Sequence, residues 1–249
     1  YMLVVNGEDG SQKGICPMTL PKDHDNTYTR HNKADYYGDE YPYMTAAMGT
    51  AYLNGKQQSA VAQFQVRTKD GKHHYHSYAY GYFDENGKNY GELRELFTFA
   101  FHDNGNPSEF HGLRIGDVDG DGRDEVMNGC FALDHNGTML WNTGIAHGDR
   151  FRLSDIDPDR PGQEIFAIQQ NAPDMLGSIL YDAANGQAIR KWYLAAVGDV
   201  GRGECMDVDA DHKGCEMWST MPDIYNAKGD VIGNAKPFPY EGIWWDGDL

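Results

Sequence analysis

The sequence predicts an all-β protein made of repeated four-stranded units, the organisation of a β-propeller. Three features support this prediction. An acidic loop occurs three times, each copy leads into a short apolar run, and Gly-containing turns typical of β-hairpins lie between the copies. The unit of loop, strand, hairpin and strand recurs at intervals of roughly 40 to 50 residues. No stretch of about 11 residues or more keeps a helical period.

Each acidic loop places Asp at alternate positions and follows them with a Glu. The three sets are Asp117, Asp119, Asp121 and Glu125; Asp155, Asp157, Asp159 and Glu164; and Asp207, Asp209, Asp211 and Glu216. Such carboxylates converge their oxygens on one point, where they would repel one another without a cation. A hard cation that takes about six to eight oxygen ligands, which is Ca²⁺, suits this arrangement. We therefore expect one calcium ion in each loop; the alternative is a set of Asx-type turns that bind nothing.

The EF-hand, another acidic calcium loop, does not explain the pattern. It requires Gly at the sixth loop position, Glu at the twelfth and helices on both sides. The first loop has Gly122 at the sixth position but Asn128 at the twelfth. The other two loops have Arg160 and His212 at the sixth position. Because a short apolar run of strand type follows each copy, the loops belong between strands of a sheet.

Four hairpin turns and the segments beside them mark the strands. The turns are 84–87, 134–137, 182–186 and 226–229, and the adjoining segments are 78–83, 139–141, 189–192 and 230–232. Residues 90–101 start with a helical spacing and end as an alternating strand. A fourth unit, without carboxylates, is expected at 49–55 and 59–64, and residues 244–249 resemble the opening of another.

Residues 1–249 are expected to form one partial propeller domain of about four blades. The segment 8–46 is rich in Asp, His, Tyr and Pro, has no clear strand period and is expected to be a long loop insertion. About four blades leave unpaired strand edges, which natural β-proteins avoid. We therefore expect the remaining blades in a longer chain or in a partner copy.

The composition excludes some classes of partner. The chain of 249 residues has 21 Lys and Arg against 38 Asp and Glu, a formal net charge of −17. Such a charge argues against nucleic acid and anionic membranes. No stretch approaches the roughly 20 apolar residues of a membrane span, and no signal peptide is present. Because Tyr1 is not an initiator Met, we expect that a signal, tag or larger segment has been removed. We also expect the protein to be exported, secreted or periplasmic in a bacterium.

The four cysteines, Cys16, Cys130, Cys205 and Cys215, are too few for a disulfide scaffold and match no zinc motif. Cys205 and Cys215 bracket the third acidic loop, so they are either bridged or two buried free thiols. The cluster 73–76 contains three His and one Tyr in a strand-like run. Since no second cluster completes a metal site, it predicts an exposed strand face.

Four further motifs lie between about His111 and Leu249. They are the run ending in Ala-His-Gly-Asp at 143–149, the second acidic loop and its strand at 155–166, Gly-Arg-Gly at 201–203, and Gly-Ile-Trp-Trp-Asp-Gly-Asp at 242–248. With these motifs the sequence resembles the rhamnogalacturonan lyases of polysaccharide lyase family 11. The resemblance implies a calcium-rich β-propeller of about eight blades that cleaves the rhamnogalacturonan backbone of pectin. This chain would supply about half of that ring.

The resemblance also assigns residues to a site. It implies that His111, His147 and Asp149 help to hold a calcium ion in a central cleft. It makes Arg202 a basic residue of the active site, either the proton acceptor or a clamp for the substrate carboxylate. Catalysis is thus expected of Arg202 and His147, and metal binding of His111 and Asp149. Independently, the glycines on either side of Arg202 predict close backbone approach and a prominent side chain.

The chemistry of such a lyase explains why these residue types are needed. It cuts a uronic acid polymer by β-elimination at galacturonate, in which a base removes the C5 proton and the O4-linked sugar leaves. The C5 proton is weakly acidic, so a cation or an Arg must neutralise the neighbouring carboxylate and the base must be held close.

Two positions depart from the family pattern. Gln170, preceded by Gln169, stands where the family has an acidic ligand, and Arg152 stands where it has a second His. A neutral ligand would loosen the central ion, whereas Arg150 and Arg152 could bind the substrate carboxylate. We expect Arg150, Arg152 and Gln170 to be substrate-binding residues. The site has either been retuned for another pectic substrate or lost its activity.

A non-catalytic calcium-binding propeller, used for carbohydrate binding or adhesion, would explain the acidic loops equally well. It does not explain His111, His147, Asp149 and Arg202, which the phase of the units places in loops on one face. Finding these four side chains together would favour the lyase, and finding them scattered would favour the binding module.

Overall fold

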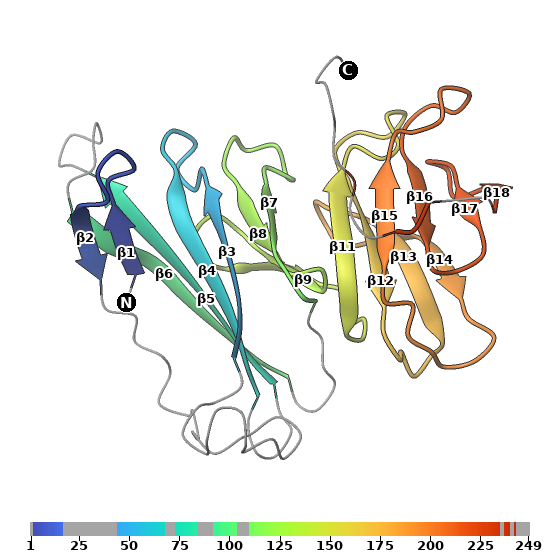
Figure 1. Cartoon of the computed structure of the whole chain (residues 1–249), viewed down its shortest axis with the longest axis horizontal. Coiled ribbons are helices and arrows are strands. Elements are labelled where there is room, and N and C mark those ends of the chain that lie inside the picture. Colours follow the sequence, from blue (N-terminus) through green and yellow to red (C-terminus); the bar gives the residue numbers. More distant parts are fainter. Residues whose placement is uncertain are drawn as a thin grey trace. The chain divides into compact units, whose positions relative to one another are not determined.

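The computed structural model describes residues 2–16, 44–67, 73–83, 92–103, 110–234, 237–239 and 242. Every regular element within these residues is a β-strand, which confirms the all-β prediction. Among the same residues no helix is long and apolar enough to cross a membrane. The strands form a two-stranded hairpin and four sheets of four strands each (Figure 1).

The strands follow the chain order within each sheet. The hairpin consists of β1 (Met2–Val5) and β2 (Gln12–Cys16). The first two sheets consist of β3 (Met44–Ala51), β4 (Ser59–Arg67), β5 (His73–Phe83) and β6 (Glu92–Asp103), and of β7 (Arg114–Gly116), β8 (Glu125–Met127), β9 (Phe131–Leu133) and β10 (Met139–Asn142). The last two consist of β11 (Gly148–Ser154), β12 (Glu164–Gln169), β13 (Leu176–Asp182) and β14 (Ala188–Tyr193), and of β15 (Gly203–Met206), β16 (Glu216–Ser219), β17 (Ile224–Tyr225) and β18 (Val231–Gly233).

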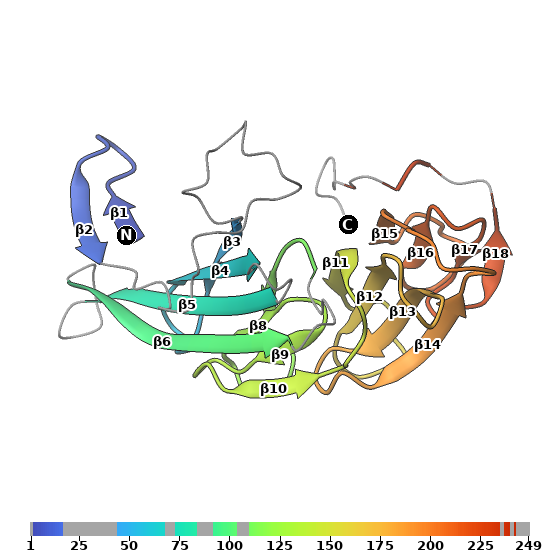
Figure 2. The ribbon, with the colours of Figure 1, turned by 90° about the horizontal axis from the view of Figure 1, so that it is seen from below.

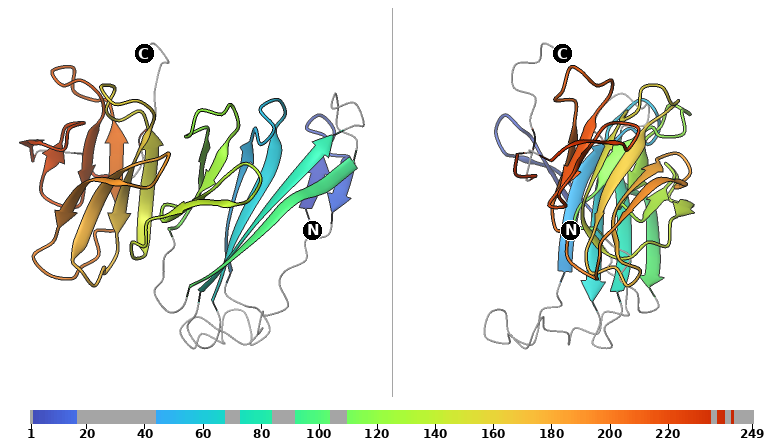
Figure 3. Two further views of the ribbon diagram at one scale, coloured as in Figure 1. Left: turned by 180° about the vertical axis from the view of Figure 1, so that it is seen from behind. Right: turned by 90° about the vertical axis from the view of Figure 1, so that its right-hand side faces the viewer.

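The chain divides into two compact units. Unit 1 comprises Tyr1–Pro107, Gly122–Val126 and Leu133–Thr138, and unit 2 comprises Ser108–Asp121, Met127–Ala132 and Met139–Leu249. Unit 2 contains the whole of the last two sheets. Figure 2 shows β11 to β14 side by side in chain order, and Figure 3 shows the sheet β15–β18 beside them.

Burial explains the different sequence patterns of the strands in unit 2. The central strand β12 reads Glu-Ile-Phe-Ala-Ile-Gln and is buried at every position, because both faces of an inner strand are covered. The outer strand β14 is instead exposed or half-buried along its length. One apolar cluster joins the last two sheets. It contains Phe166, Ile168 and Leu180 of the sheet β11–β14 and Met217 and Tyr225 of the sheet β15–β18.

The hairpin turns confirm three of the four turn predictions. Gly137, Gly186 and Gly229 have φ of 85°, 71° and 82°, a left-handed conformation that favours glycine. The fourth turn, 84–87, lies outside the described residues, as do 244–249 and the side chains of 73–76. The acidic loops lie where expected, between the first and second strands of their sheets.

One expectation for the N-terminal half is corrected. The segment 8–46 is not a loop throughout, because Gln12–Cys16 forms β2, which pairs with β1 in the register Met2↔Cys16, and residues 44–46 belong to β3. The reversal uses a turn in which Gly10 donates to the carbonyl of Asn6 at 2.8 Å. The strand expected at the end of 90–101 is present, since Glu92–Asp103 forms β6, which pairs with β5 along its length.

Two equivalent glycines test how tightly the acidic loops pack. Gly162 and Gly214 both have φ of 90°, but a Cβ at Gly162 would meet nothing within 4 Å. A Cβ at Gly214 would overlap the carbonyl oxygen of Ile156 and lie 2.7 Å from Pro158 Cδ. We expect Gly214→Ala to destabilise unit 2 by about 2–4 kcal/mol and Gly162→Ala by about 1–2 kcal/mol, measured by denaturant unfolding. Equal losses would contradict the packing of the third loop against the second.

Candidate active site

Four side chains that the sequence analysis singled out lie together in unit 2. The Nε2 atoms of His111 and His147 are 3.5 and 3.8 Å from Oδ1 of Asp149. Nη1 of Arg202 is 3.5 Å from the other carboxylate oxygen, Oδ2. The two imidazole rings pack edge to face with their centroids 4.9 Å apart. Residues from three separate parts of the chain therefore converge on one buried carboxylate, Asp149.

Gly148 explains how His147 and Asp149 reach His111. It forms a parallel bridge with Phe110, the residue before His111. A Cβ at Gly148 would overlap the Phe110 ring and the carbonyl oxygen of Ile168. Only glycine allows β11 to pass this close to Phe110. Asn128 fixes Phe110 from the other side, since its Oδ1 accepts the Phe110 N–H at 3.1 Å.

The glycines beside Arg202 have the role that the sequence predicts. Gly201 has φ of 67°, and a Cβ at Gly203 would overlap the side chain of Ile168. The backbone of Arg202 is fixed by donation to the carbonyl of Val200 at 2.7 Å, and its Nη1 donates to the carbonyl of Gly201 at 2.9 Å. The guanidinium is thus presented to Asp149 while a third of the side chain stays exposed.

His111, His147 and Asp149 suit a cation. One ligand atom of each lies within 4.8 Å of the others, so a single ion can contact all three. Two imidazole nitrogens and a carboxylate form an acceptable donor set for a divalent metal. Arg202 shares the carboxylate, so an ion bound here would lie next to a guanidinium.

Arg150 lines a positively charged hollow that adjoins the same cluster. A cavity of about 210 Å³ is lined by His111, Arg114, Arg150, Phe151 and Arg152. Arg150 donates through Nη1 to the carbonyl oxygens of His111 and Asp149 at 3.4 and 3.5 Å. These neutral acceptors leave the charge of Arg150 available to an anion. The hollow can therefore bind a carboxylate beside His111.

Arg114 was missed by the sequence analysis. It starts β7, lies 5.3 Å from the centre of the Phe151 ring and contributes to the same cavity. Burial, and next the nearby charge of Arg152, lower the pKa of the Arg114 guanidinium from its ordinary value. No local motif marks this residue, because it reaches the site by contact with Phe151 of β11, a strand of another sheet.

Arg152 and Gln170 both donate hydrogen bonds to carboxylates. Arg152 donates through Nε and Nη2 to the two oxygens of Glu204 at 2.6 and 2.8 Å, and Glu204 is 3% exposed. Gln170 donates through Nε2 to Oδ2 of Asp199 at 2.7 Å. Glu204 and Asp199 were not predicted. The positions at which the chain departs from the family pattern are thus tied to the segment around Arg202.

The second and third acidic loops share one backbone frame. Oε2 of Glu164 accepts the N–H groups of Ile156 and Asp157 at 2.9 and 3.1 Å. Oε2 of Glu216 accepts those of Val208 and Asp209, both at 2.9 Å. Burial raises the pKa of Glu164 from its usual range. Each glutamate therefore holds its loop against the start of the following strand.

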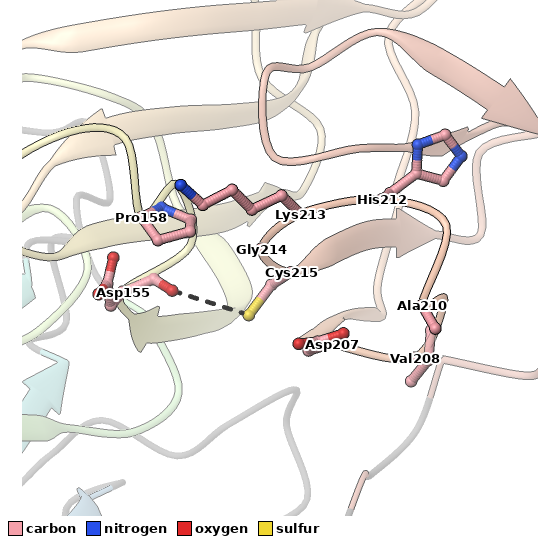
Figure 4. Close-up of a pocket in the computed structure, with 9 residues that line it drawn as sticks. All are labelled: Asp155, Pro158, Asp207, Val208, Ala210, His212, Lys213, Gly214 and Cys215. Atoms are coloured by element: carbon pink, nitrogen blue, oxygen red, sulfur yellow. Dashed lines mark hydrogen bonds between the residues drawn. The ribbon is translucent and has the colours of Figure 1, made fainter. Parts of the chain in front are cut away.

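The aspartates of the loops form Asx-type hydrogen bonds. Oδ1 of Asp117 accepts the N–H of Gly120 at 2.8 Å, and Oδ1 of Asp119 accepts that of Asp121 at 3.1 Å. In the later loops the bonds run from Asp159 N to Asp157 Oδ1 at 3.1 Å and from Asp211 N to Asp209 Oδ1 at 3.0 Å. Asp155 and Asp207 line an open hollow of about 670 Å³ between these loops (Figure 4). Glu125 starts β8 and is fully buried.

The cysteines beside the third loop are free thiols. Cys205 and Cys215 both lie in the interior. Cys215 donates to the carbonyl of Asp155 at 3.9 Å, the contact drawn in Figure 4. Its thiol pKa is lowered, first by its hydrogen bond with Cys205. Of the two alternatives that the sequence left open, the structure has two free thiols.

The family model described as "Rhamnogalacturonan lyase family 11, C-terminal domain" matches residues 1–249. Rhamnogalacturonan endolyase YesW of Bacillus subtilis (strain 168) is 37% identical over 222 residues, which are 86% of this chain and 33% of YesW. Rhamnogalacturonan exolyase YesX of the same organism is 32% identical over 262 residues, 100% of this chain and 40% of YesX.

Solved structures of such proteins are similar as well. The crystal structure of YesW has a TM-score of 0.74 at 31% identity, and a Bacillus licheniformis rhamnogalacturonan lyase has 0.72 at 33%. Each match covers 99% of this chain and 40% of the other. The chain spans between 33% and 40% of the length of the curated relatives it matches.

The Arg152–Glu204 pair yields a stability prediction. Arg152→Met would leave the buried Glu204 carboxylate without its guanidinium, so we expect a loss of about 3–5 kcal/mol. Arg190→Met is the matched control, because Arg190 and Asp230 pair at 3.4 Å on the surface and should contribute about 0–1 kcal/mol. Denaturant unfolding measures both. If Arg152→Met costs no more than the control, Glu204 does not depend on Arg152.

Proposed function

We propose that this chain, which belongs to rhamnogalacturonan lyase family 11, is part of an enzyme that cleaves the rhamnogalacturonan backbone by β-elimination at galacturonate. The observation that carries the proposal is the convergence of His111, His147 and Arg202 on Asp149. A loop-stabilised binding module needs no such convergence. The arginine-lined hollow beside His111 supports a uronate substrate.

The four four-stranded sheets support a propeller as the architecture of the proposed enzyme. Each sheet is a meander of the kind that makes one blade, so this chain would supply about four of about eight blades. The remaining blades would come from a longer chain or a partner copy. We also propose that the enzyme is exported, secreted or periplasmic in a bacterium, since its substrate is an acidic polysaccharide of plant cell walls.

Different residues of this chain would bind the substrate, hold the ion and transfer the proton during β-elimination. Arg150 and Arg114 would bind the galacturonate carboxylate in the hollow, and Gln170, with its partner Asp199, would lie at the substrate-binding side. His111, His147 and Asp149 would hold a calcium ion, whose positive charge would stabilise the carbanion that forms at C5. Arg202 would accept the C5 proton or bind the substrate carboxylate, and His147 would accept the proton when it does not bind the ion.

A second candidate function, a non-catalytic carbohydrate-binding module, has one observation in its favour. Glu204 takes two N–H groups of Arg152, and this leaves less of that guanidinium for a substrate carboxylate. Under this alternative the hollow would still bind an acidic sugar, but no product with a new double bond would form.

The lyase proposal predicts a large effect at Arg202. Arg202→Lys keeps the positive charge but loses the planar fork, so the rate should fall about 100- to 10,000-fold. The assay follows the ultraviolet absorbance of the unsaturated uronate product from rhamnogalacturonan, with the full-length protein. Arg190→Lys, on the exposed strand β14, should keep wild-type activity. Wild-type activity in Arg202→Lys would place the chemistry on other residues.

We also propose that calcium organises the third loop. Oε1 of Glu216 is buried and has no hydrogen-bond partner among the described residues, which suits a metal ligand. Excess EGTA should therefore lower the melting temperature as well as the activity. A melting temperature that EGTA leaves unchanged would remove the structural role of the ion.

A further inference from the structure

The second and third acidic loops match position by position. In addition to the glutamate and Asx contacts, Arg160 N donates to the Asp157 carbonyl at 2.8 Å and His212 N donates to the Asp209 carbonyl at 3.0 Å. Gly162 and Gly214 share φ of 90°. Because the backbone frames are the same, a difference in cation binding between the loops must come from side chains.

The second loop already contains positive charge. Nζ of Lys228 lies 2.6 Å from Oδ1 of Asp157 and 2.9 Å from Oδ2 of Asp159. Nζ of Lys213 lies 2.5 Å from Oδ1 of Asp159. Nε of Arg160 lies 3.4 Å from Oε1 of Glu164. Three of the four carboxylates of this loop thus have a cationic partner.

The third loop lacks these partners. Among the described residues, the cationic contact to its carboxylates is that of His212, whose Nε2 lies 3.9 Å from Oδ2 of Asp209 and is charged only when protonated. Lys213 belongs to this loop but extends toward Pro158 of the second loop (Figure 4). The buried Oε1 of Glu216, which corresponds to the oxygen of Glu164 that Arg160 contacts, has no hydrogen-bond partner in the described part of the chain.

The position of Lys228 is built into the fold. It lies in the β17–β18 turn, where Oδ1 of Asn226 accepts its N–H at 3.0 Å and that of Asp230 at 2.9 Å. The preceding Ala227 is 2% exposed and belongs to the apolar cluster of unit 2. The turn therefore fixes the backbone of Lys228 at a place from which its side chain reaches the second loop. The corresponding turn of the sheet β7–β10 has Asn136 in place of a lysine.

We propose that the second acidic loop takes its cation from the chain itself, the ammonium of Lys228 supported by Arg160, and that a divalent ion binds the third loop instead. A divalent ion on Asp157 and Asp159 would have to displace an ammonium in direct contact with both. At such a separation two positive charges repel strongly in a partly buried site. The four carboxylates of the second loop thus do not suit a calcium ion.

This inference concerns the metal content of the loops and does not depend on lyase activity. Its test counts the bound ions and measures the thermal stability of the protein, and neither measurement needs substrate. The loops of the wild-type protein are expected to differ: the third should lose its ion when a carboxylate is neutralised, and the second should have none to lose.

The test compares Lys228→Met with wild type by native mass spectrometry and thermal unfolding in calcium and in EGTA, using the full-length protein. We expect Lys228→Met to bind one calcium ion more per chain than wild type. Its melting temperature should also depend on calcium by a few degrees more, because the emptied site now requires a metal. Lys191→Met, an exposed lysine of β14, is the matched control and should change neither quantity. A variant that gains no ion overturns the proposal.

Two further variants keep the test decisive should Lys228→Met fail to fold. Asp159→Asn removes an exposed carboxylate of the second loop and is expected to leave the ion count unchanged. Asp211→Asn makes the same change at the matching position of the third loop and is expected to lower the count by one. If Asp159→Asn lowers the count by one, the second loop holds a metal and the proposal is wrong.

Discussion

Neutralisation of buried carboxylates is the constraint on which the rest of this structure depends. The net charge of the chain is −17, and six acidic side chains are buried in its described part. They are Glu125, Asp149, Asp157, Glu164, Glu204 and Glu216. An ionised carboxylate in the interior costs several kcal/mol unless hydrogen-bond donors or cations surround it. The fold must therefore bring a partner to each such group.

The kind of partner decides what each carboxylate does. Both carboxylate oxygens of Glu204 accept N–H groups of Arg152, and the two side chains form a structural ion pair. In Glu164 and Glu216 one carboxylate oxygen accepts backbone N–H groups. The other oxygen contacts Arg160 in Glu164 and has no hydrogen-bond partner among the described residues in Glu216. Asp149 lies beside two imidazoles and a guanidinium, and the two imidazoles could bind a metal together with it. A shared electrostatic requirement thus produces structural pairs, loop anchors and the candidate active site.

Local patterns predicted much of this arrangement. The alternating aspartates identified the acidic loops because their geometry is set within a few residues. Glycine turns identified the hairpins for the same reason, and Gly201 and Gly203 indicated the exposed position of Arg202. The resemblance to a known family supplied the convergence of His111, His147 and Asp149, which no spacing in the sequence reveals.

The partners that cross between strands or sheets were not predictable. Lys228 lies 71 positions from Asp157, and Glu204 lies 52 from Arg152. Neither lysine nor glutamate belongs to a motif, so their roles appear only when β15–β18 packs beside β11–β14. The strand β2 was missed for a related reason. Its Gln-Lys-Gly-Ile-Cys sequence has little strand character, and pairing with β1 decides its conformation.

The two residues that depart from the family pattern both contact one short segment, 199–204. Arg152 contacts Glu204, Gln170 contacts Asp199, and Arg202 lies between these two acidic residues in the sequence. Arg152, which stands in place of a His, is paired with the carboxylate of Glu204. Gln170, which stands in place of an acidic residue, is hydrogen-bonded to the carboxylate of Asp199. The segment 199–204 thus holds Arg152 and Gln170 through two acidic side chains while it presents Arg202 to Asp149.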